Sequence, residues 1–323
     1  MSFSTDELTY ATELVGRWVP PTAQYAWPLL SAEVGADVWV KHENQTPVGA
    51  FKIRGGLVYA DRLRARRPDV AGIVSATRGN HGQSLAFAGR ANDLAVTIVV
   101  PHGNSPDKNA AMRALGAEVV EHGHDYQASR EYSIELAAGR GLDVVPPYHP
   151  DLVLGVATYA RELFEAVGEL DTIYVPVGMG TGICGLIGVR DLFGLQTEIV
   201  GVVSELAPAT ALSFAAGKVV TTESAATFVD GVACRAPDPT AIDVINAGAA
   251  RILQVTEDSC ADAVRLLLST THNLAEPAGA IALAGLMSER PAMRGRRVAV
   301  IQSGGNMDTP LLTQILAGHT PVV

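Results

Sequence analysis

Short apolar runs rich in β-branched residues recur along the chain, and each is followed by a turn and a segment of helical periodicity. The clearest runs are AGIVSA at 71–76, AVTIVV at 95–100, TIYVPV at 172–177 and EIVGVVS at 198–204. A strand that is buried on both faces has such a sequence, and alternation with helices is typical of a parallel sheet covered on both sides. The pattern therefore predicts an α/β fold with doubly wound sheets.

The same pattern indicates two lobes. Segments 5–15 and 155–167 are expected to be helices, and RVAVIQSGGN at 297–306 is expected to be the last strand with its turn. At 323 residues the chain exceeds the usual size of a single core. Because it has no low-complexity linker, we expect the lobes to interleave at Pro146–Pro147, with a ligand site in the crevice between them.

Composition narrows the class of protein. Hydrophobic residues make up 48% of the chain and charged residues 18%, with 32 glycines, which fits a compact, loop-rich enzyme. The formal net charge is -10 and no basic run is present, so neither nucleic acid nor an anionic membrane surface is an expected partner. We expect a small-molecule partner instead.

The cysteines and the N-terminal segment indicate the compartment. Cys184, Cys234 and Cys260 lie in apolar or helical settings without metal-binding spacing, which is typical of reduced, buried thiols. The first residues show no signal-peptide pattern, and no apolar run approaches the roughly 18 residues of a membrane span. We therefore expect a soluble, cytoplasmic protein without a membrane partner.

The stretch KHENQTPVGAFKIRGG at 41–56 is the most informative one, and Lys52 lies at its centre. The glycines around Lys52 mark a place where a strand gives way to a helix and where the backbone can approach a ligand closely. Desolvation there would lower the pKa of the lysine, and its neutral amine would attack a carbonyl to form a Schiff base. The alternative is a surface lysine that follows a buried Phe51, and this stretch alone leaves both open.

Three glycine-rich turns follow predicted strands. SATRGNHGQ at 75–83 and PVGMGTGICG at 176–185 each open a helix, so their amides are expected to face a carboxylate or a phosphate. SGGN at 303–306 follows the last strand. Each turn alone is equally well a tight connection. Together with Lys52, they fit a ligand with two anionic ends and a carbonyl, such as pyridoxal phosphate joined to an amino acid.

Four motifs resemble, in their order along the chain, those of the fold-type II pyridoxal-phosphate enzymes of the serine/threonine dehydratase and serine racemase group: GAFKIRG, GNHGQ, PVGMGTG and SGGN. TRGNHGQS is most similar to a subgroup with hydroxyectoine-utilisation, phenylserine and threonine dehydratases. The resemblance implies a tryptophan synthase β-like fold of two lobes, each with a largely parallel sheet flanked by helices. Residues 1–71 and 149–323 would form a large cofactor-binding domain, and residues 72–148 a small domain that binds the substrate carboxylate.

The resemblance also implies a role for each matching residue. Lys52 would hold the aldehyde of pyridoxal 5'-phosphate and later carry the α-proton, while Phe51 would pack against the cofactor. Asn80 would bond the 3-hydroxyl, and Ser303 would face the pyridine nitrogen, which favours prompt β-elimination. The other implied contacts are Gly231 and Glu276 beside the ring and Gly178, Met179, Gly180, Thr181 and Gly182 around the phosphate.

The turn before the second helix would bind the substrate, through Thr77, Arg78, Gly79, Asn80 and the amide of His81. Arg78 departs from the group, because many members carry Ser or Ala there and the racemases use a serine as their second acid–base. An arginine stays protonated and is a poor proton donor or acceptor, which argues against racemisation by the usual pair. Arg78 either points to solvent or an Asp, or it recognises a carboxylate or polar group of the substrate.

A metal site is not expected. Racemase-like relatives bind a divalent ion after the strand that here precedes ELAPATA, and Glu205 and the carbonyl of Ala209 match two of its ligands. Ala211 replaces the third, an aspartate, so one hard oxygen ligand is missing. The histidines, among them His42 and His149, show no metal-binding spacing and are expected on the surface or in loops.

The resemblance implies a lyase that removes water and ammonia from a β-hydroxy-α-amino acid and gives a 2-oxo acid. L-threonine, L-serine and L-threo-phenylserine are the candidate substrates. The alternatives are a hydroxyectoine-utilisation dehydratase, a 3-hydroxyaspartate ammonia-lyase, an amino-acid racemase and a non-catalytic amino-acid sensor. The group is commonly dimeric, so we expect a homodimer.

Overall fold

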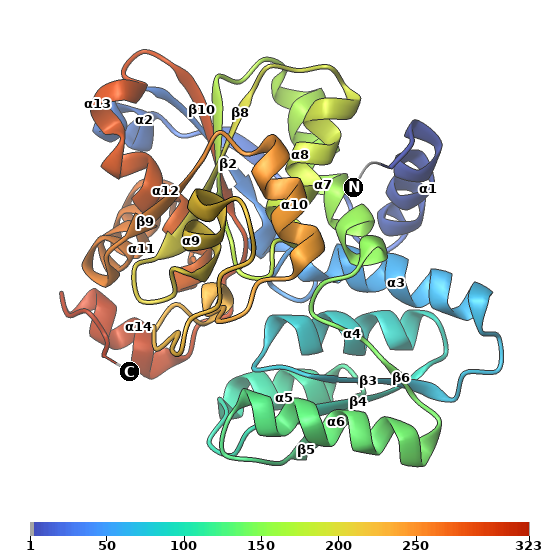
Figure 1. The fold of residues 1–323 in the computed structure, drawn as a ribbon. Helices are drawn as coiled ribbons and strands as arrows, with labels where there is room; N and C mark the ends of the chain where they lie inside the picture. The colour runs from blue at the N-terminus through green and yellow to red at the C-terminus, as the bar shows by residue number, and fades with distance from the viewer. Residues whose placement is uncertain (1–2, 323) are drawn as a thin grey trace.

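The computed structural model describes residues 3–322 and has an α/β architecture with two separate sheets (Figure 1). The larger sheet has the strand order β1-β2-β10-β7-β8-β9, and all its neighbouring pairs are parallel except β1 and β2. Its strands are β1 (Gln24–Ala26), β2 (Asp37–His42), β7 (Thr172–Pro176), β8 (Glu198–Ser204), β9 (Arg251–Val255) and β10 (Arg297–Gln302). The predicted fold class is confirmed.

The smaller sheet is entirely parallel and has the order β5-β4-β3-β6. Its strands and helices are β3 (Gly72–Ala76), α4 (Asn80–Ala91), β4 (Ala95–Val100), α5 (Pro106–Ala114), β5 (Glu118–Glu121), α6 (Tyr126–Arg140) and β6 (Asp143–Val144). We call residues 72–144, which contain these elements and the loops between them, the small lobe, and the rest of the described chain the large lobe (Figure 1). The small lobe falls within 72–148, and the substrate-binding role of that range stays a prediction.

Successive residues of the larger sheet point into two different cores. Val200 and Val202 of β8 share a core with α11 and α12, whereas Ile199 and Val203 share one with α7 and α8. A strand covered on both faces needs apolar residues at consecutive positions, which explains the unbroken runs in the sequence.

The helices of the large lobe surround this sheet. They are α1 (Thr5–Gly16), α2 (Pro28–Val34), α3 (Lys52–Arg66), α7 (Pro150–Val167), α8 (Thr181–Leu192), α9 (Ala209–Ala216), α10 (Pro239–Gly248), α11 (Glu257–Thr271), α12 (Pro277–Ser288), α13 (Arg290–Met293) and α14 (Thr309–Leu316). Helix α7 begins earlier than the expected residue 155, because Pro150 suits a first helical position and the His149 side chain accepts from the Asp151 amide. Among residues 3–322, no helix is both long and apolar enough to cross a membrane.

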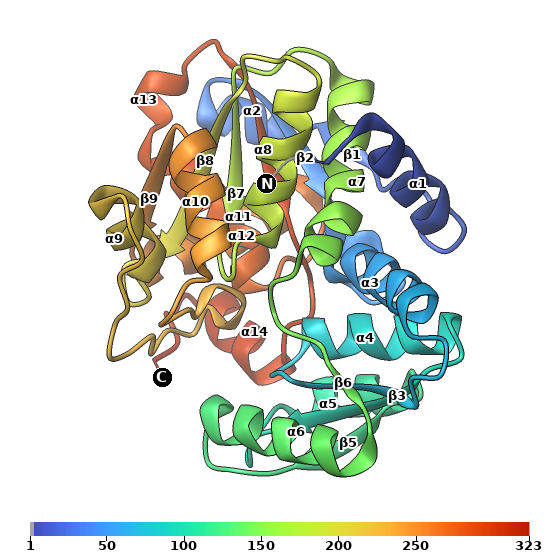
Figure 2. The same cartoon turned by 45° about the vertical axis from the view of Figure 1, so that its right-hand side comes forward.

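Helices α3 and α4 pack together and join the two lobes (Figure 2). Ile53 and Leu57 of α3 share one hydrophobic core with Leu85 of α4 and Ile98 of β4. The chain returns to the large lobe through a segment around Pro146–Pro147 whose flanking residues are buried. The lobes are therefore packed against each other over a continuous core.

A buried cluster of charges fixes the first turns of α3. The guanidinium of Arg54 bonds Oε2 of Glu43 at 2.7 Å and Oε1 of Glu162 at 2.6 Å, and Nζ of Lys41 lies 2.6 Å from Oε2 of Glu162. The two acidic and two basic side chains neutralise each other's charge. Removal of one partner from such a buried cluster lowers the free energy of unfolding by about 3–5 kcal/mol. The start of α3 is thus firmly held.

Candidate active site

Lys52 is the first residue of α3 and lies beside the end of β10. The amide of Phe51 donates to the carbonyl oxygen of Ser303 at 3.0 Å, and Ala50 forms an isolated bridge with Gly304. The turn that carries Lys52 and the distant SGGN turn therefore form one unit.

The amine of Lys52 lies in desolvating surroundings. It shares a narrow space with His81 and Thr181 and lies 5.1 Å from the centroid of the Phe51 ring, while part of the lysine side chain stays accessible. Burial lowers the pKa of Lys52 to about 8, against the opposing effect of the Glu276 carboxylate. A substantial fraction of the amine is therefore neutral near physiological pH. The environment is that of a desolvated lysine rather than of a surface lysine.

Asn80 and Glu276 form a hydrogen-bonded pair between the lobes. Nδ2 of Asn80 donates to Oε1 of Glu276 at 2.6 Å, and Nδ2 of Asn306 donates to Oδ1 of Asn80 at 2.8 Å. Burial raises the pKa of Glu276 to about 7, although the Lys108 ammonium and the bond from Asn80 act against it. Glu276 therefore changes charge in nearly the same pH range as Lys52.

Residues 178–182, which we call the glycine cradle, lead into α8. A Cβ atom at Gly178 would collide with the carbonyl oxygen of Gly231. Gly180 is the N-cap of α8 and has a φ of 94°, in the left-handed region that favours glycine. The cradle thus needs glycine at these two positions.

Neighbouring elements hold the remaining cradle residues. The hydroxyl of Tyr159 donates to the carbonyl oxygen of Gly182 at 3.2 Å, and Sγ of Cys234 lies 3.5 Å from Sδ of Met179. Thr181 is buried at the first position of α8. The cradle is therefore fixed from α7 on one side and from the segment before α10 on the other.

Residues 77–81, which we call the α4 turn, lead into α4. The amide of Gly79 donates to Oγ1 of Thr77 at 3.2 Å, and α4 begins at Asn80 without a side-chain cap. Arg78 is exposed, and it forms no ion pair with any residue of the range 3–322. Its guanidinium is available to solvent or to a ligand.

The imidazole of His81 is buried beside Lys52. Its Nε2 atom has no hydrogen-bond partner within the described chain. Burial, together with the charge of Lys52, lowers the pKa of His81 to about 3, so the ring stays neutral. Buried polar atoms are nearly always bonded, so this nitrogen is available to a bound ligand. The sequence had assigned only the amide of His81 to the site.

The helix starts fall into two kinds. Six helices have a side chain that accepts from a first-turn amide: α1, α5, α6, α7, α10 and α11. The other eight helices have no such cap within residues 3–322, and four of these eight, α3, α4, α8 and α12, begin at candidate cofactor- or substrate-site residues or next to one. Uncapped amides at a positive helix end favour an anionic ligand.

Ser303 and Gly231 meet at the first turn of α12. The hydroxyl of Ser303 donates to the carbonyl oxygen of Ala278 at 3.2 Å, and a Cβ atom at Gly231 would lie 2.6 Å from the Cβ of Ala278. The structure thus brings these two residues to the same helix start, next to Glu276. Their contacts with a ring stay predictions.

The weak metal candidates lie outside this cluster. Glu205 is exposed after β8, and Ala209 is buried at the start of α9. Within residues 3–322, no group of three or more His, Cys, Asp or Glu side chains could hold a metal ion.

The expectation of a surface or loop position is wrong for His42. It is fully buried at the end of β2, where its Nε2 accepts from Nε1 of Trp27 at 2.9 Å. Strand β2 lies between β1 and β10, so its last residue is covered from both sides.

Three polar residues close to the site escaped the sequence analysis. Asn306 is the last residue of the SGGN motif, so the motif could have identified it as a site residue. Lys108 of α5 and Asp230, whose side chains pair at 3.2 Å, belong to different lobes and gave no local signal.

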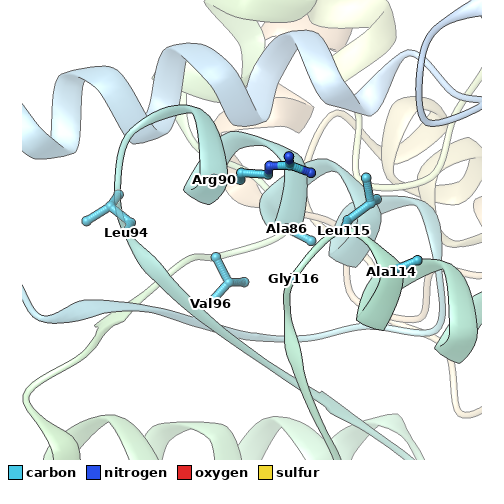
Figure 3. Close-up of a pocket in the computed structure, with 7 residues that line it drawn as sticks. All are labelled: Ala86, Arg90, Leu94, Val96, Ala114, Leu115 and Gly116. Atoms are coloured by element: carbon cyan, nitrogen blue, oxygen red, sulfur yellow. The ribbon is translucent and has the colours of Figure 1, made fainter.

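A second hollow, of about 300 Å³, lies on the small lobe at the far end of α4 (Figure 3). Leu94, Val96 and Leu115 line it, and Arg90 is its one charged side chain among the residues drawn. It contains none of the candidate site residues. Lys52, His81 and Thr181 line the narrower space instead.

These residues fit pyridoxal phosphate. The reachable, desolvated amine of Lys52 suits the aldehyde, and the glycine cradle at the uncapped start of α8 suits the phosphate. The unpartnered Nε2 of His81 and the Asn80–Glu276 pair supply further polar groups beside Lys52. The donor set is therefore that of a cofactor with an aldehyde and an anionic arm.

Comparison with known proteins also points to an enzyme that uses pyridoxal phosphate. L-threo-3-hydroxyaspartate ammonia-lyase of Pseudomonas sp is 31% identical over 98% of this chain and 99% of that protein. Serine racemase of Schizosaccharomyces pombe is 27% identical over 94% of each chain. The structure of a threonine deaminase from T.th. superimposes with a TM-score of 0.88 at 29% identity, over 95% of this chain and 99% of that one.

A family model described as pyridoxal-phosphate dependent enzyme matches residues 17–304. That range includes every candidate residue of the cofactor site, from Phe51 to Ser303. The chain therefore belongs to the pyridoxal-phosphate dependent enzymes and has their fold-type II architecture.

Proposed function

We propose that this pyridoxal-phosphate-dependent dehydratase and ammonia-lyase of hydroxy-amino acids acts on small β-hydroxy-α-amino acids of the L-serine and L-threonine type. The products would be a 2-oxo acid and ammonia. One observation carries the proposal: Lys52, with a pKa near 8, opens α3 next to the uncapped starts of α4 and α8. A reactive amine beside two anion-binding helix ends is what a carboxylate-bearing substrate and a phosphate-bearing cofactor require.

The two lobes would divide the work. The large lobe would hold the cofactor through Lys52, the glycine cradle and Ser303. The small lobe would hold the α-carboxylate of the substrate on the α4 turn, whose first amides carry no side-chain cap. Asn80 would connect the two, because its side chain bonds Glu276 across the lobe boundary.

When bound, the cofactor supplies an electron sink for the bond broken at the α-carbon. The chain's own part is to move protons. Neutral Lys52 accepts the α-proton, and burial favours its neutral form. Loss of hydroxide from the β-carbon leaves a carbon–carbon double bond. The resulting enamine tautomerises and adds water, releasing ammonia and the 2-oxo acid, so no external oxidant or reductant is needed.

A substrate panel tests this function. The purified holoenzyme is given L-serine, L-threonine, L-threo-phenylserine and L-threo-3-hydroxyaspartate separately, and 2-oxo acid and ammonia are measured together with the enantiomer of each substrate. Equal amounts of oxo acid and ammonia are expected from at least one compound. Formation of enantiomer without oxo acid would identify a racemase, and no reaction of any compound would contradict the proposal.

L-threo-3-hydroxyaspartate is the second candidate substrate. The exposed guanidinium of Arg78 belongs to the α4 turn and has no acidic partner within residues 3–322, so it can bind a second carboxylate. The relative from Pseudomonas sp supports the same choice. A kcat/KM for this compound well above that for L-serine would establish it.

We also propose a homodimer in the cytoplasm. The resemblance to a commonly dimeric group supports the dimer, and three buried free cysteines support a reducing compartment. Light scattering on the purified protein tests the first point, with a monomer as the contradicting result. Localisation of the tagged protein tests the second.

A further inference from the structure

The first turn of α5 forms a polar contact between the lobes. The hydroxyl of Ser105, the N-cap of α5, donates to Oδ1 of Asp308 at 2.5 Å. Asp308 is itself the N-cap of α14 but makes no cap bond to that helix, because its carboxylate faces Ser105. Within the same turn, Nζ of Lys108 lies 3.2 Å from Oδ2 of Asp230 in the large lobe. Two large-lobe carboxylates thus meet the positive end of a small-lobe helix.

Lys108 also touches the α4 turn. A Cβ atom at Gly79 would lie 2.9 Å from Cδ of Lys108, so the aliphatic part of the lysine fills the space beside that glycine. The backbone of the α4 turn therefore rests on the Lys108 side chain.

Lys108 is also connected to the glycine cradle, through the large-lobe residue Asp230. Its partner Asp230 precedes Gly231, whose carbonyl oxygen lies against Gly178. The Lys108 side chain is mostly buried, and although burial acts against its charge, the carboxylates of Asp230, Glu276 and Asp308 raise its pKa. It therefore remains an ammonium ion throughout the physiological range.

We propose that Lys108 is a positioning residue that fixes the α4 turn relative to the glycine cradle. Its stem supports Gly79, and its ammonium anchors that support to Asp230, beside the cradle. The two anion sites thereby keep the separation that bound cofactor and substrate require. This inference rests on the proposed function of both sites. Lys108 touches no reacting atom and acts through Gly79 and Asp230.

Five variants of the holoenzyme separate the stem from the charge: Lys108→Ala, Lys108→Met, Lys108→Arg, Asp230→Asn and the double variant Lys108→Met with Asp230→Asn. Lys218→Met is the matched control, since Lys218 is exposed beyond the site. Amide hydrogen exchange in a peptide that covers residues 77–83 is measured without substrate. KM and kcat are measured with every compound of the panel that reacts, and cofactor binding is followed by absorbance.

Lys108→Ala should speed exchange in residues 77–83 and raise KM about tenfold for all substrates alike, with kcat and cofactor binding nearly unchanged. Lys108→Met and Asp230→Asn should each raise KM about three- to fivefold, the range expected for a partly exposed ion pair. The double variant should be no worse than either single one. Lys108→Arg should stay close to the unmodified enzyme, and Lys218→Met should be unchanged.

Unchanged exchange in Lys108→Ala, or multiplied effects in the double variant, would overturn the inference. A loss confined to L-threo-3-hydroxyaspartate would also overturn it, because Lys108 would then contact the distal carboxylate. Hydrogen exchange needs no turnover. It therefore decides the positioning role even if the panel contradicts the proposed function.

Discussion

Helices α8 and α4 begin in the same way, without a side-chain cap and after a glycine-rich turn. At α8, the glycine cradle is closed by its surroundings, because Gly178 touches Gly231 and Tyr159 bonds Gly182. At α4, the turn carries the exposed Arg78 and rests on Lys108 of another helix. One end is rigid and built of backbone, and the other has charged side chains at its edge.

This difference fits two binding tasks: one helix end would bind the phosphate, which does not vary, and the other would bind a substrate that varies. A phosphate is the same in every catalytic cycle, so backbone amides with no room for side chains suffice to bind it. A substrate differs in its β-substituent, and side chains such as Arg78 can distinguish one compound from another. We therefore expect substitutions at the cradle to affect cofactor binding and substitutions at the α4 turn to affect substrate preference.

The largest expected effect lies between the two ends. Lys52→Ala removes the amine that we propose receives the cofactor and the α-proton, so turnover should fall by at least about 10³-fold. The absorbance of the lysine-bound cofactor should disappear with it. Lys218→Met serves as the control, and retention of both absorbance and turnover in Lys52→Ala would refute the assignment.

Gly178→Ala tests the rigid end. The added methyl group meets the carbonyl oxygen of Gly231, and overpacking of this kind costs about 1–3 kcal/mol. Cofactor affinity, measured by titration of the apoprotein, should therefore fall about ten- to hundredfold. Gly139→Ala, in an open position of α6, should leave it unchanged. If both variants bind the cofactor equally well, the cradle does not contact the phosphate.

Arg78→Ala tests the adaptable end. If the guanidinium binds a second carboxylate, kcat/KM for L-threo-3-hydroxyaspartate should fall about ten- to hundredfold, the range for a charged hydrogen bond. L-serine should be affected much less, and cofactor affinity should not change. Arg130→Ala, an exposed change on α6, is the matched control. An equal fall in kcat/KM for all substrates would mean that Arg78 does not recognise the second carboxylate.

Glu276→Gln should give the smallest effect, a shift in pH dependence. The amide oxygen of the new side chain can still accept from Asn80, but the negative charge that raises the pKa of Lys52 is lost. The pKa of Lys52 should then fall below about 8, so its neutral form persists to lower pH. The rate of cofactor attachment to the apoprotein, followed against pH, should move its midpoint to lower pH. A midpoint that moves upward would mean that Glu276 does not act on Lys52 through its charge.

Sequence reasoning succeeded where the information is local. The doubly wound sheets, the desolvated surroundings of Lys52 and the two glycine-rich helix starts depend on neighbouring residues, and the motifs contain them. The support from Lys108 and the orientation of Asn80 by Asn306 depend on contacts between distant segments, which no local pattern encodes. His42 was misjudged for the same reason, since its burial follows from the strands on either side.

Borohydride reduction of the holoenzyme tests the central claim most directly. The chain has only four lysines, Lys41, Lys52, Lys108 and Lys218, so peptide mass mapping can assign the reduced cofactor without ambiguity. The account predicts a single tag on Lys52. A tag on any of the other three, or no tag on any lysine, would contradict it.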